Sequence, residues 1–317
     1  MGCGKWCQRR ELNPRPKAYE SSALPLSYSG TSAVVGASGG NTTGRFARQT
    51  LFEPGHHRPP RAPGGAFGLA RSSAKVACIT EMKLSFAGER LLAVVAHPDD
   101  AELLCAGTLA RAGAEGAAIG ICVLAKGDKG QPSRPIKNLP TVRRREMEAA
   151  ARVIGAALFC AGLADGEVAD TLAARRQLVE ILRRFKPSLV LTHAAADYHP
   201  DHRGASELTE AATWFAASGG HRTKSKPLAR PPALWFMDTL QMTGFVPGFY
   251  VDISAFTTHK EKMLACHQSQ LARAGDTNFS PLLEVMRLQY RARGAQAGVA
   301  AAEAFRIHDA FKRAQAW

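Results

Sequence analysis

The 317-residue chain is 45% apolar, which is typical of a globular protein, and it carries a formal net charge of +14. Half of that charge lies in residues 1–81, which hold 11 Lys/Arg and 4 Asp/Glu, and no basic run is interleaved with aromatic residues, so we expect no nucleic-acid partner. The sequence has no stretch of 18 apolar residues, no apolar secretory core and only scattered cysteines, so we expect a cytoplasmic protein without an integral membrane segment.

Residues 1–81 differ in composition from the rest of the chain, being rich in Gly, Ser, Pro and Arg without a helical or strand period. We expect them to form a disordered low-complexity extension without a catalytic role. The segment from Trp6 to Gly30 resembles peptides that arise when a transfer-RNA gene upstream of a reading frame is translated. One interpretation is a mis-assigned start, with Met82 as the initiator; the alternative is a natural disordered tail or a transit peptide. In both cases the folded domain is expected at 82–317.

From Met82 onward, short apolar runs alternate with helical patterns. The pattern predicts strands at 91–97, 117–125, 157–160 and 188–193, and helices at 101–115, 141–154 with Thr141 as cap, and 171–185. A further helix is expected from Asp201 or Gly204 through Ala217, then strands at 233–238 and 249–254, with helices filling the C-terminal end. Strands that alternate with helices predict an α/β, Rossmann-like three-layer fold with a mostly parallel sheet.

The first motif with chemical potential is AHPDDAE, residues 96–102, at the end of a predicted buried strand. Ligands of open α/β sheets bind outside the carboxyl ends of the strands, and core packing does not explain a His and two carboxylates there. Pro98 fixes the turn, so His97 and Asp100 can point at one spot while Asp99 is directed elsewhere. The alternative interpretation is an ordinary N-cap and turn, where Asp is common.

The second motif, DYHPDHR at 197–203, follows another predicted buried strand and uses the same residue types. Neutral imidazole and carboxylate suit Zn²⁺, and catalytic zinc sites keep three protein ligands and one open position. His97, Asp100 and His202 are available as three ligands. Asp99 and His199 then remain as the carboxylate and imidazole that proton transfer requires.

From Met82 onward the chain resembles the LmbE/PIG-L family of zinc-dependent N-deacetylases. AHPDDAELLCAGTLA matches the first family signature and HPDHR the second, and the stretch GAQAGVAAAEAF at 294–305 resembles the closing segment of bacterial members, bacillithiol-type deacetylases included. The resemblance implies metal binding by His97, Asp100 and His202, with Asp99 as general base. It also implies that His199 stabilises the oxyanion or protonates the leaving amine.

Other segments extend the resemblance. RRREMEAAARVIG at 143–155 resembles the family's R-x-x-E helix, which makes Arg143 the expected substrate-facing arginine, although a lone Arg on a helix usually faces solvent. ADG at 164–166 resembles a family turn that places Asp165 near a sugar hydroxyl; the alternative is a plain Asp-Gly turn. HQSQ at 267–270 is interpreted as mainly structural. Asp201 is expected to support an imidazole from outside the ligand set.

These observations predict zinc-dependent hydrolysis of the N-acetyl amide of an N-acetylglucosamine-type glycoconjugate, with release of acetate and a free amine. The expected partner is a small amino-sugar conjugate, and the resemblance also allows a homo-oligomer. Two alternatives stay open. One is a metal-dependent phosphoesterase, because His/Asp clusters also build two-metal sites. The other is a non-catalytic sugar-binding protein stabilised by a metal ion.

Overall fold

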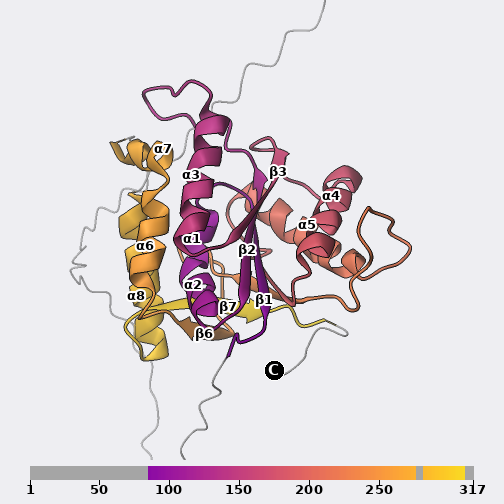
Figure 1. The fold of residues 1–317 in the computed structure, drawn as a ribbon. Helices are drawn as coiled ribbons and strands as arrows, with labels where there is room; N and C mark the ends of the chain where they lie inside the picture. The colour runs from indigo at the N-terminus through magenta and orange to yellow at the C-terminus, as the bar shows by residue number, and fades with distance from the viewer. Residues whose placement is uncertain (1–84, 276–280, 311–317) are drawn as a thin grey trace, which may run out of the picture. The chain divides into compact units, whose positions relative to one another are not determined.

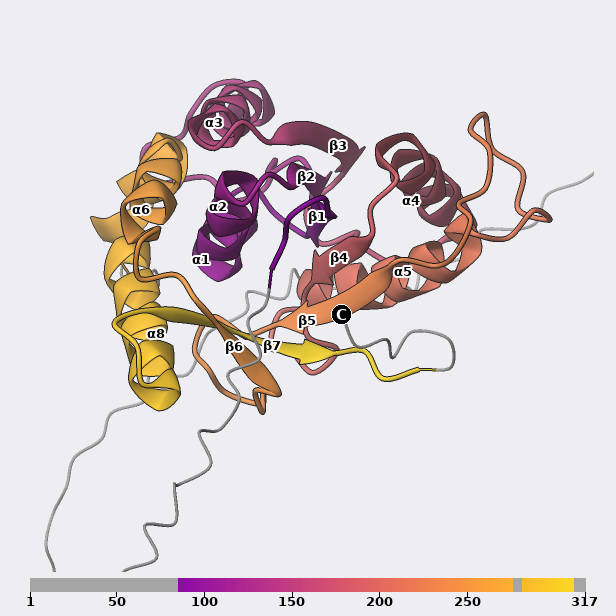
Figure 2. The same ribbon diagram turned by 60° about the horizontal axis from the view of Figure 1, so that its bottom comes forward.

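The computed structural model describes residues 85–275 and 281–310, so the extension expected at 1–81 lies outside the described residues. Figure 1 shows the fold, and within the described residues seven strands form a single sheet in the order β3-β2-β1-β4-β5-β7-β6, which can be followed in Figure 2. Their bounds are β1 (Arg90–Val95), β2 (Ala118–Ala125), β3 (Ala157–Leu163), β4 (Leu189–Thr192), β5 (Ala233–Met237), β6 (Phe249–Asp252) and β7 (Ala302–Ile307).

Helices separate most of these strands along the chain. They are α1 (Asp100–Leu104), α2 (Ala106–Ala114), α3 (Leu139–Val153), α4 (Leu172–Phe185), α5 (Pro200–Ala216), α6 (Thr257–Ala265), α7 (Gln268–Leu271), the short 3₁₀ helix η1 (Ala272–Gly275) and α8 (Leu282–Ala297). None of the helices in the described ranges combines the length and apolar character needed to span a membrane.

Strands β1 to β5 pair in parallel, and β7 runs antiparallel to β5 on one side and to β6 on the other. The predicted α/β fold with a mostly parallel sheet is therefore confirmed. The chain moves outward from β1 through β2 and β3, then returns to the other side of β1 as β4 and continues to β5. The strand order thus reverses between β1 and β4, and such a switch point is where open α/β sheets bind their ligands.

The helices form a layer on each face of the sheet. Figure 2 shows α4 and α5 on one face and α1, α2, α3, α6 and α8 on the other. Leu91, Ala93 and Val95 of β1 pack in the core beneath the second group of helices, whereas Leu92 and Val94 pack beneath α4 and α5. Successive side chains of a strand point to opposite faces, so a strand covered on both faces is apolar throughout.

The single helix predicted over 101–115 is wrong in one respect, because Cys105 interrupts it (φ −146°, ψ 7°) and separates α1 from α2. Glu303 of β7 accepts hydrogen bonds from two backbone N–H groups in the first turn of α2, at 2.9 and 2.7 Å. Lys260 of α6 donates to the Leu103 carbonyl oxygen at 2.9 Å and pairs with Glu303 at 2.6 Å. This buried ion pair satisfies the backbone groups that the break leaves without helical partners.

Two predicted helix starts also differ from the structure. Thr141 was expected to cap a helix but lies inside α3, whose N-cap is Asn138 in the left-handed region (φ 56°). Helix α5 was expected to open at Asp201 or Gly204 but begins at Pro200, with His199 as its N-cap. In α5 a ring nitrogen takes the capping role that sequence reasoning assigns to Asp, Asn, Ser or Thr.

The expectation that helices fill the C-terminal end is wrong for β7. Helix α8 ends at Ala297, where the left-handed backbone of Gly298 (φ 73°) terminates it. The chain then enters the sheet between β5 and β6. The strand has the sequence AEAFRI and opens on Ala, Glu and Ala. Ala and Glu favour helices, so the pairing with two neighbouring strands overrides the local preference here.

Helix α5 is seated by a close backbone contact at Gly204, where an added Cβ would lie 1.9 Å from the Val168 carbonyl oxygen. We expect Gly204→Ala to push α5 away from this turn and to lower the free energy of unfolding by about 1–3 kcal/mol, measured by chemical denaturation. Gly219→Ala is the matched control, because a Cβ there meets no atom within 4 Å. Equal losses in the two variants would contradict the steric explanation.

Candidate active site

A cavity of about 610 Å³ lies at the switch point, beyond the carboxyl ends of β1 and β4. It is lined by side chains from both sequence motifs and from later segments of the chain. Its lining includes His97, Asp99, Asp100, Tyr198, His199, Asp201 and His202, together with Arg143, Asp165 and Gln270. The structure therefore brings every residue singled out by the sequence to one cavity.

Asp99 precedes α1 at the N-cap position, but its carboxylate does not cap the helix. The residue has a left-handed backbone (φ 94°, ψ −20°) and makes no side-chain capping hydrogen bond. Its Oδ2 instead accepts a hydrogen bond from Gln270 Nε2 at 3.0 Å. The N-cap interpretation thus does not account for this carboxylate. A non-glycine residue held in this region costs on the order of 1–3 kcal/mol, and such strain concentrates at functional sites.

Asp100 lies between two imidazoles. Its Oδ2 accepts a hydrogen bond from the His97 backbone N–H at 2.7 Å, which folds the carboxylate back over the turn. Oδ2 is 3.5 Å from His97 Nδ1, and Oδ1 is 3.4 Å from His202 Nε2. Two ligand atoms of a tetrahedral zinc ion lie roughly 3.4 Å apart when the metal–ligand bonds are about 2.1 Å. Each of these two spacings matches that of a pair of zinc ligands, as do the donor types.

The outer nitrogen of each of these imidazoles faces a second carboxylate. His97 Nε2 donates to Asp201 Oδ2 at 2.8 Å, and His202 Nδ1 lies 3.1 Å from Asp197 Oδ1. Carboxylates in this position orient metal-ligating imidazoles and select the tautomer that leaves the inner nitrogen unprotonated. The inner nitrogens, His97 Nδ1 and His202 Nε2, are the ones that face Asp100.

The acidic surroundings change the protonation of these groups. Burial lowers the pKa of His97 and His202, but Asp100 outweighs it, and the pKa values rise to about 9 and about 10. Burial raises the pKa of Asp99 to about 7. Burial opposes ionisation of Asp100 too, but His202 and His193 hold its pKa well below the usual range. The same negative field attracts a divalent cation, which must displace the imidazole protons in order to bind.

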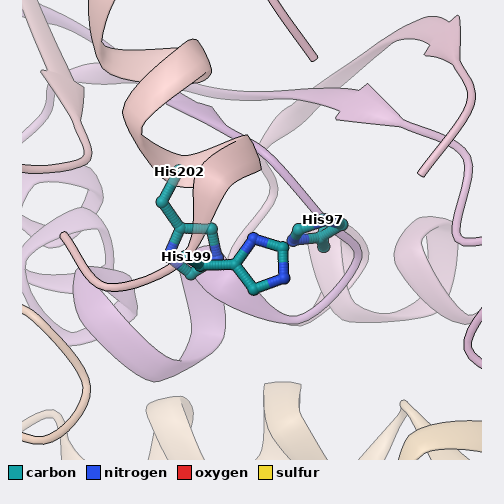
Figure 3. Close-up of side chains that lie close together, drawn as sticks. All are labelled: His97, His199 and His202. Carbon is teal, nitrogen blue, oxygen red and sulfur yellow. The ribbon is translucent and has the colours of Figure 1, made fainter. Parts of the chain in front are cut away.

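His199 lies beside this pair, with its ring centroid 4.9 Å from that of His97 and 4.8 Å from that of His202 (Figure 3). Ring nitrogens of these three residues come within 4.8 Å of one another, so they are themselves a group able to hold a metal ion. The Nδ1 atom of His199 accepts a hydrogen bond from the Asp201 backbone N–H at 3.2 Å. The proton of the neutral ring is therefore on Nε2, which can act as a hydrogen-bond donor.

His193 is a site residue that the sequence reasoning missed. It follows β4 directly, is fully buried, and stacks on His202 with ring centroids 4.0 Å apart. Its Nε2 accepts a hydrogen bond from the Ala96 backbone N–H at 3.0 Å, and it forms a second candidate metal group with Asp100 and His202. Its position immediately after a buried strand, similar to that of His97 two residues after the end of β1, was the signal available in the sequence.

Arg143 and Asp165 line the cavity but are bound to one loop of the protein. Arg143, which is buried, donates to the carbonyl oxygens of Gly127 and Gly130 at 2.9 and 2.7 Å. Asp165 accepts from the backbone N–H groups of Gly127 and Lys129 at 2.8 and 3.0 Å. Both residues thus shape the loop at 127–130, and their contact with a substrate stays a prediction.

The parallel sheet, with His and Asp side chains gathered where its strand order reverses, defines the chain as an α/β enzyme with a candidate metal centre. Residues 92–213 match the family model described as PIG-L, GlcNAc-PI de-N-acetylase. The structure resembles the crystal structure of the conserved protein TT1542 from Thermus thermophilus, with 34% identity and a TM-score of 0.61 over 72% of this chain and all of the other. The chain belongs to the LmbE/PIG-L family.

Two characterised relatives catalyse different reactions. The chain is 25% identical to diacetylchitobiose deacetylase of Thermococcus kodakarensis, over 64% of this chain and 78% of the relative. It is 24% identical to 4-oxalmesaconate hydratase of Pseudomonas putida, over 61% of this chain and 78% of the relative. The relatives of this chain thus include both a deacetylase and a hydratase.

The left-handed backbone of Asp99 leads to a stability prediction. Asp99→Gly and Asp99→Ala remove the same carboxylate, but an alanine Cβ at this φ is unfavourable by about 1–2 kcal/mol. We therefore expect Asp99→Gly to have the larger free energy of unfolding of the two, measured by denaturant titration. Equal stability of the two variants would show that Asp99 does not hold a strained backbone.

Proposed function

We propose that the chain is a zinc-dependent hydrolase that removes the N-acetyl group of an N-acetylglucosamine-type conjugate and releases acetate and a free amine. The observation that carries this proposal is the arrangement around Asp100. The ring nitrogens of His97 and His202 lie 3.5 and 3.4 Å from the oxygens of Asp100, and the other nitrogen of each ring faces a further carboxylate. Asp99, the next residue in the chain, adds a separate buried carboxylate. Three ligands with an open position and a spare carboxylate are the parts that a catalytic zinc site requires.

In this proposal His97, Asp100 and His202 hold the ion. Zinc bound there would polarise the amide carbonyl and lower the pKa of a water molecule to about 7. Asp99 takes the proton from the attacking water and later returns it to the leaving amine. A pKa raised to about 7 by burial suits a group that must both accept and release a proton near neutrality.

His199 acts in this proposal as a hydrogen-bond donor to the developing oxyanion. Its Nδ1 is occupied as an acceptor by the helix cap, which leaves Nε2–H to donate. Burial and the neighbouring His202 and His97 lower the pKa of His199, so the donor is the neutral ring, rather than the charged form. Loss of one oxyanion donor typically costs on the order of 10²–10³ in kcat.

The phosphoesterase alternative has less support. A two-metal site needs further free carboxylates to hold the second ion. Here Asp201 and Asp197 face the outer nitrogens of the two imidazoles, and Asp165 accepts from the backbone of the 127–130 loop. A metal that only stabilises a binding protein has less support too, because structural zinc sites are closed by four ligands and need no spare base.

The amino-sugar substrate class is supported by the family model and by the deacetylase relative of Thermococcus kodakarensis. The cavity also presents an aromatic face, since Tyr198 lines it and is 55% exposed. An exposed aromatic ring beside polar groups is the type of surface on which a sugar ring packs. We propose that the protein acts in the cytoplasm.

A substrate panel tests the proposal. The full chain, loaded with zinc, is incubated with N-acetylglucosaminides of different aglycones, and acetate and free amine are measured together. We expect equimolar release of the two products, loss of turnover after chelation, and its recovery when zinc is added back. Phosphate release from phosphomonoesters, hydration of an unsaturated acid without acetate release, or full turnover after chelation would contradict the proposal.

Metal content separates the ligand from the base. We expect a His97→Ala/His202→Ala variant to lose stoichiometric zinc, whereas Asp99→Ala keeps zinc yet loses nearly all turnover, because Asp99 moves a proton without holding the ion. Zinc is measured by elemental analysis of the purified proteins. His221→Ala is the matched control, because this exposed imidazole stacks on Phe215 away from the cavity. Stoichiometric zinc in the double variant would overturn the ligand assignment.

A further inference from the structure

Two sequence motifs with no assigned joint role meet in the structure. Arg143 and Glu146, one turn apart on α3, both contact the short helix α7. Glu146 accepts hydrogen bonds from the Ser269 backbone N–H at 2.8 Å and from the Ser269 hydroxyl at 2.6 Å. Arg143 Nη2 donates to Gln270 Oε1. The two helices are therefore joined at adjacent residues of α7, directly beside the cavity.

The contact with Arg143 fixes which way the Gln270 amide points. A guanidinium offers only N–H donors, so the oxygen of the amide must face Arg143. The amide nitrogen then faces the other way, toward Asp99, and donates to its Oδ2 at 3.0 Å. The reversed amide would place N–H groups against N–H groups and an oxygen against a carboxylate. All three residues are buried, with 2%, 8% and 5% exposure for Arg143, Gln270 and Asp99, so neither mismatch could be relieved by solvent.

The direction of this hydrogen bond determines which oxygen of Asp99 is available. Oδ2 is occupied as the acceptor from Gln270, which leaves Oδ1 for the proton of a water molecule in the cavity. The Asp99 backbone is strained and its carboxylate makes no capping hydrogen bond, so its direction depends on side-chain partners. A carboxylate that must transfer a proton along one line needs such a partner, because misplacement by about 1 Å can cost on the order of 10²-fold in rate.

We propose that Gln270 is a positioning residue that holds the Asp99 carboxylate in the direction required for proton transfer, and that Arg143 and Glu146 hold Gln270 in turn. This inference rests on the proposed function, in which Asp99 is the base. It gives Arg143 a role toward the protein instead of the substrate. It also gives the R-x-x-E and HQSQ segments one shared role, which is to orient the Asp99 carboxylate.

Gln270→Met tests the proposal, since methionine keeps the length and volume of glutamine and removes both amide groups. We expect kcat for acetate release to fall about 10- to 100-fold, because misplacement of a catalytic group by about 1 Å can cost up to the order of 10²-fold in rate. We expect KM and zinc content to stay near those of the unaltered protein, because no substrate contact or ligand is changed. Gln268→Met is the matched control on the same helix, where the exposed amide donates only to the Ala265 carbonyl.

Gln270→Glu is a second variant that keeps an oxygen acceptor for Arg143 and so preserves the link to α3. It presents an oxygen in place of the N–H toward Asp99, and we expect kcat to fall at least as far as in Gln270→Met. A kcat within about twofold of the unaltered protein in both variants would overturn the proposal, as would a loss explained by raised KM or by lost zinc. If Gln270→Met does not fold, as judged by its thermal transition, Gln270→Glu decides.

A structural measurement separates this proposal from the proposed function. If the unaltered protein releases no acetate from any substrate of the panel, the deacetylase proposal fails, and kcat can no longer be used to test the role of Gln270. Crystal structures of the unaltered protein and of Gln270→Met then show whether the Asp99 carboxylate rotates when its partner is removed. Rotation supports the positioning role; an unchanged Asp99 side chain in Gln270→Met overturns it.

Discussion

The site depends on the approach of the Asp100 carboxylate to two imidazoles that come from segments a hundred residues apart in the chain. Asp100 lies within 3.5 Å of His97 Nδ1 and 3.4 Å of His202 Nε2 only because β1 and β4 are neighbours at the point where the strand order reverses. The backbone contact at Gly204 seats the helix that carries His202. Burying a carboxylate and charged imidazoles costs free energy unless each has a partner. The carboxylates of Asp201 and Asp197, which face the other ring nitrogens of His97 and His202, are therefore needed for the same arrangement.

Most of the sheet and the candidate ligands could be predicted from the sequence, because each depends on a local pattern. A buried strand such as β1 is an unbroken apolar run, and its polar ending marks the functional edge. The interruption at Cys105 and the strand β7 could not be predicted in the same way. Both depend on the buried pair of Lys260 and Glu303 and on pairing with distant strands, which no local pattern records.

The candidate site shows the same division between local and distant causes. The residue types and spacing of the motifs around His97 and His202 indicate a metal site from the sequence alone. The signals for His193 and Gln270 are weaker, because His193 has only its position after a buried strand and Gln270 only its place in the HQSQ segment, and each becomes part of the site through its neighbours. The expectation that Arg143 faces a substrate came from the resemblance of residues 143–155 to the family's R-x-x-E helix, which is a local pattern. It does not show that this face of the helix meets α7 and the loop at 127–130.

Four aspartates in and around this cavity show how different contacts give identical side chains different roles. Asp197 and Asp201 face the outer nitrogens of imidazoles, Asp100 faces the inner ones, and Asp99 faces an amide. His202, whose pKa is raised to about 10, favours the ionised form of Asp100 against the effect of burial, whereas burial raises the pKa of Asp99, whose hydrogen-bond donor Gln270 is neutral, to about 7. Adjacent carboxyl groups with pKa values pushed apart can take different roles in one reaction. A neutral partner such as Gln270 suits the role proposed for Asp99, because a cation in that position would lower the pKa of Asp99 and weaken it as a base.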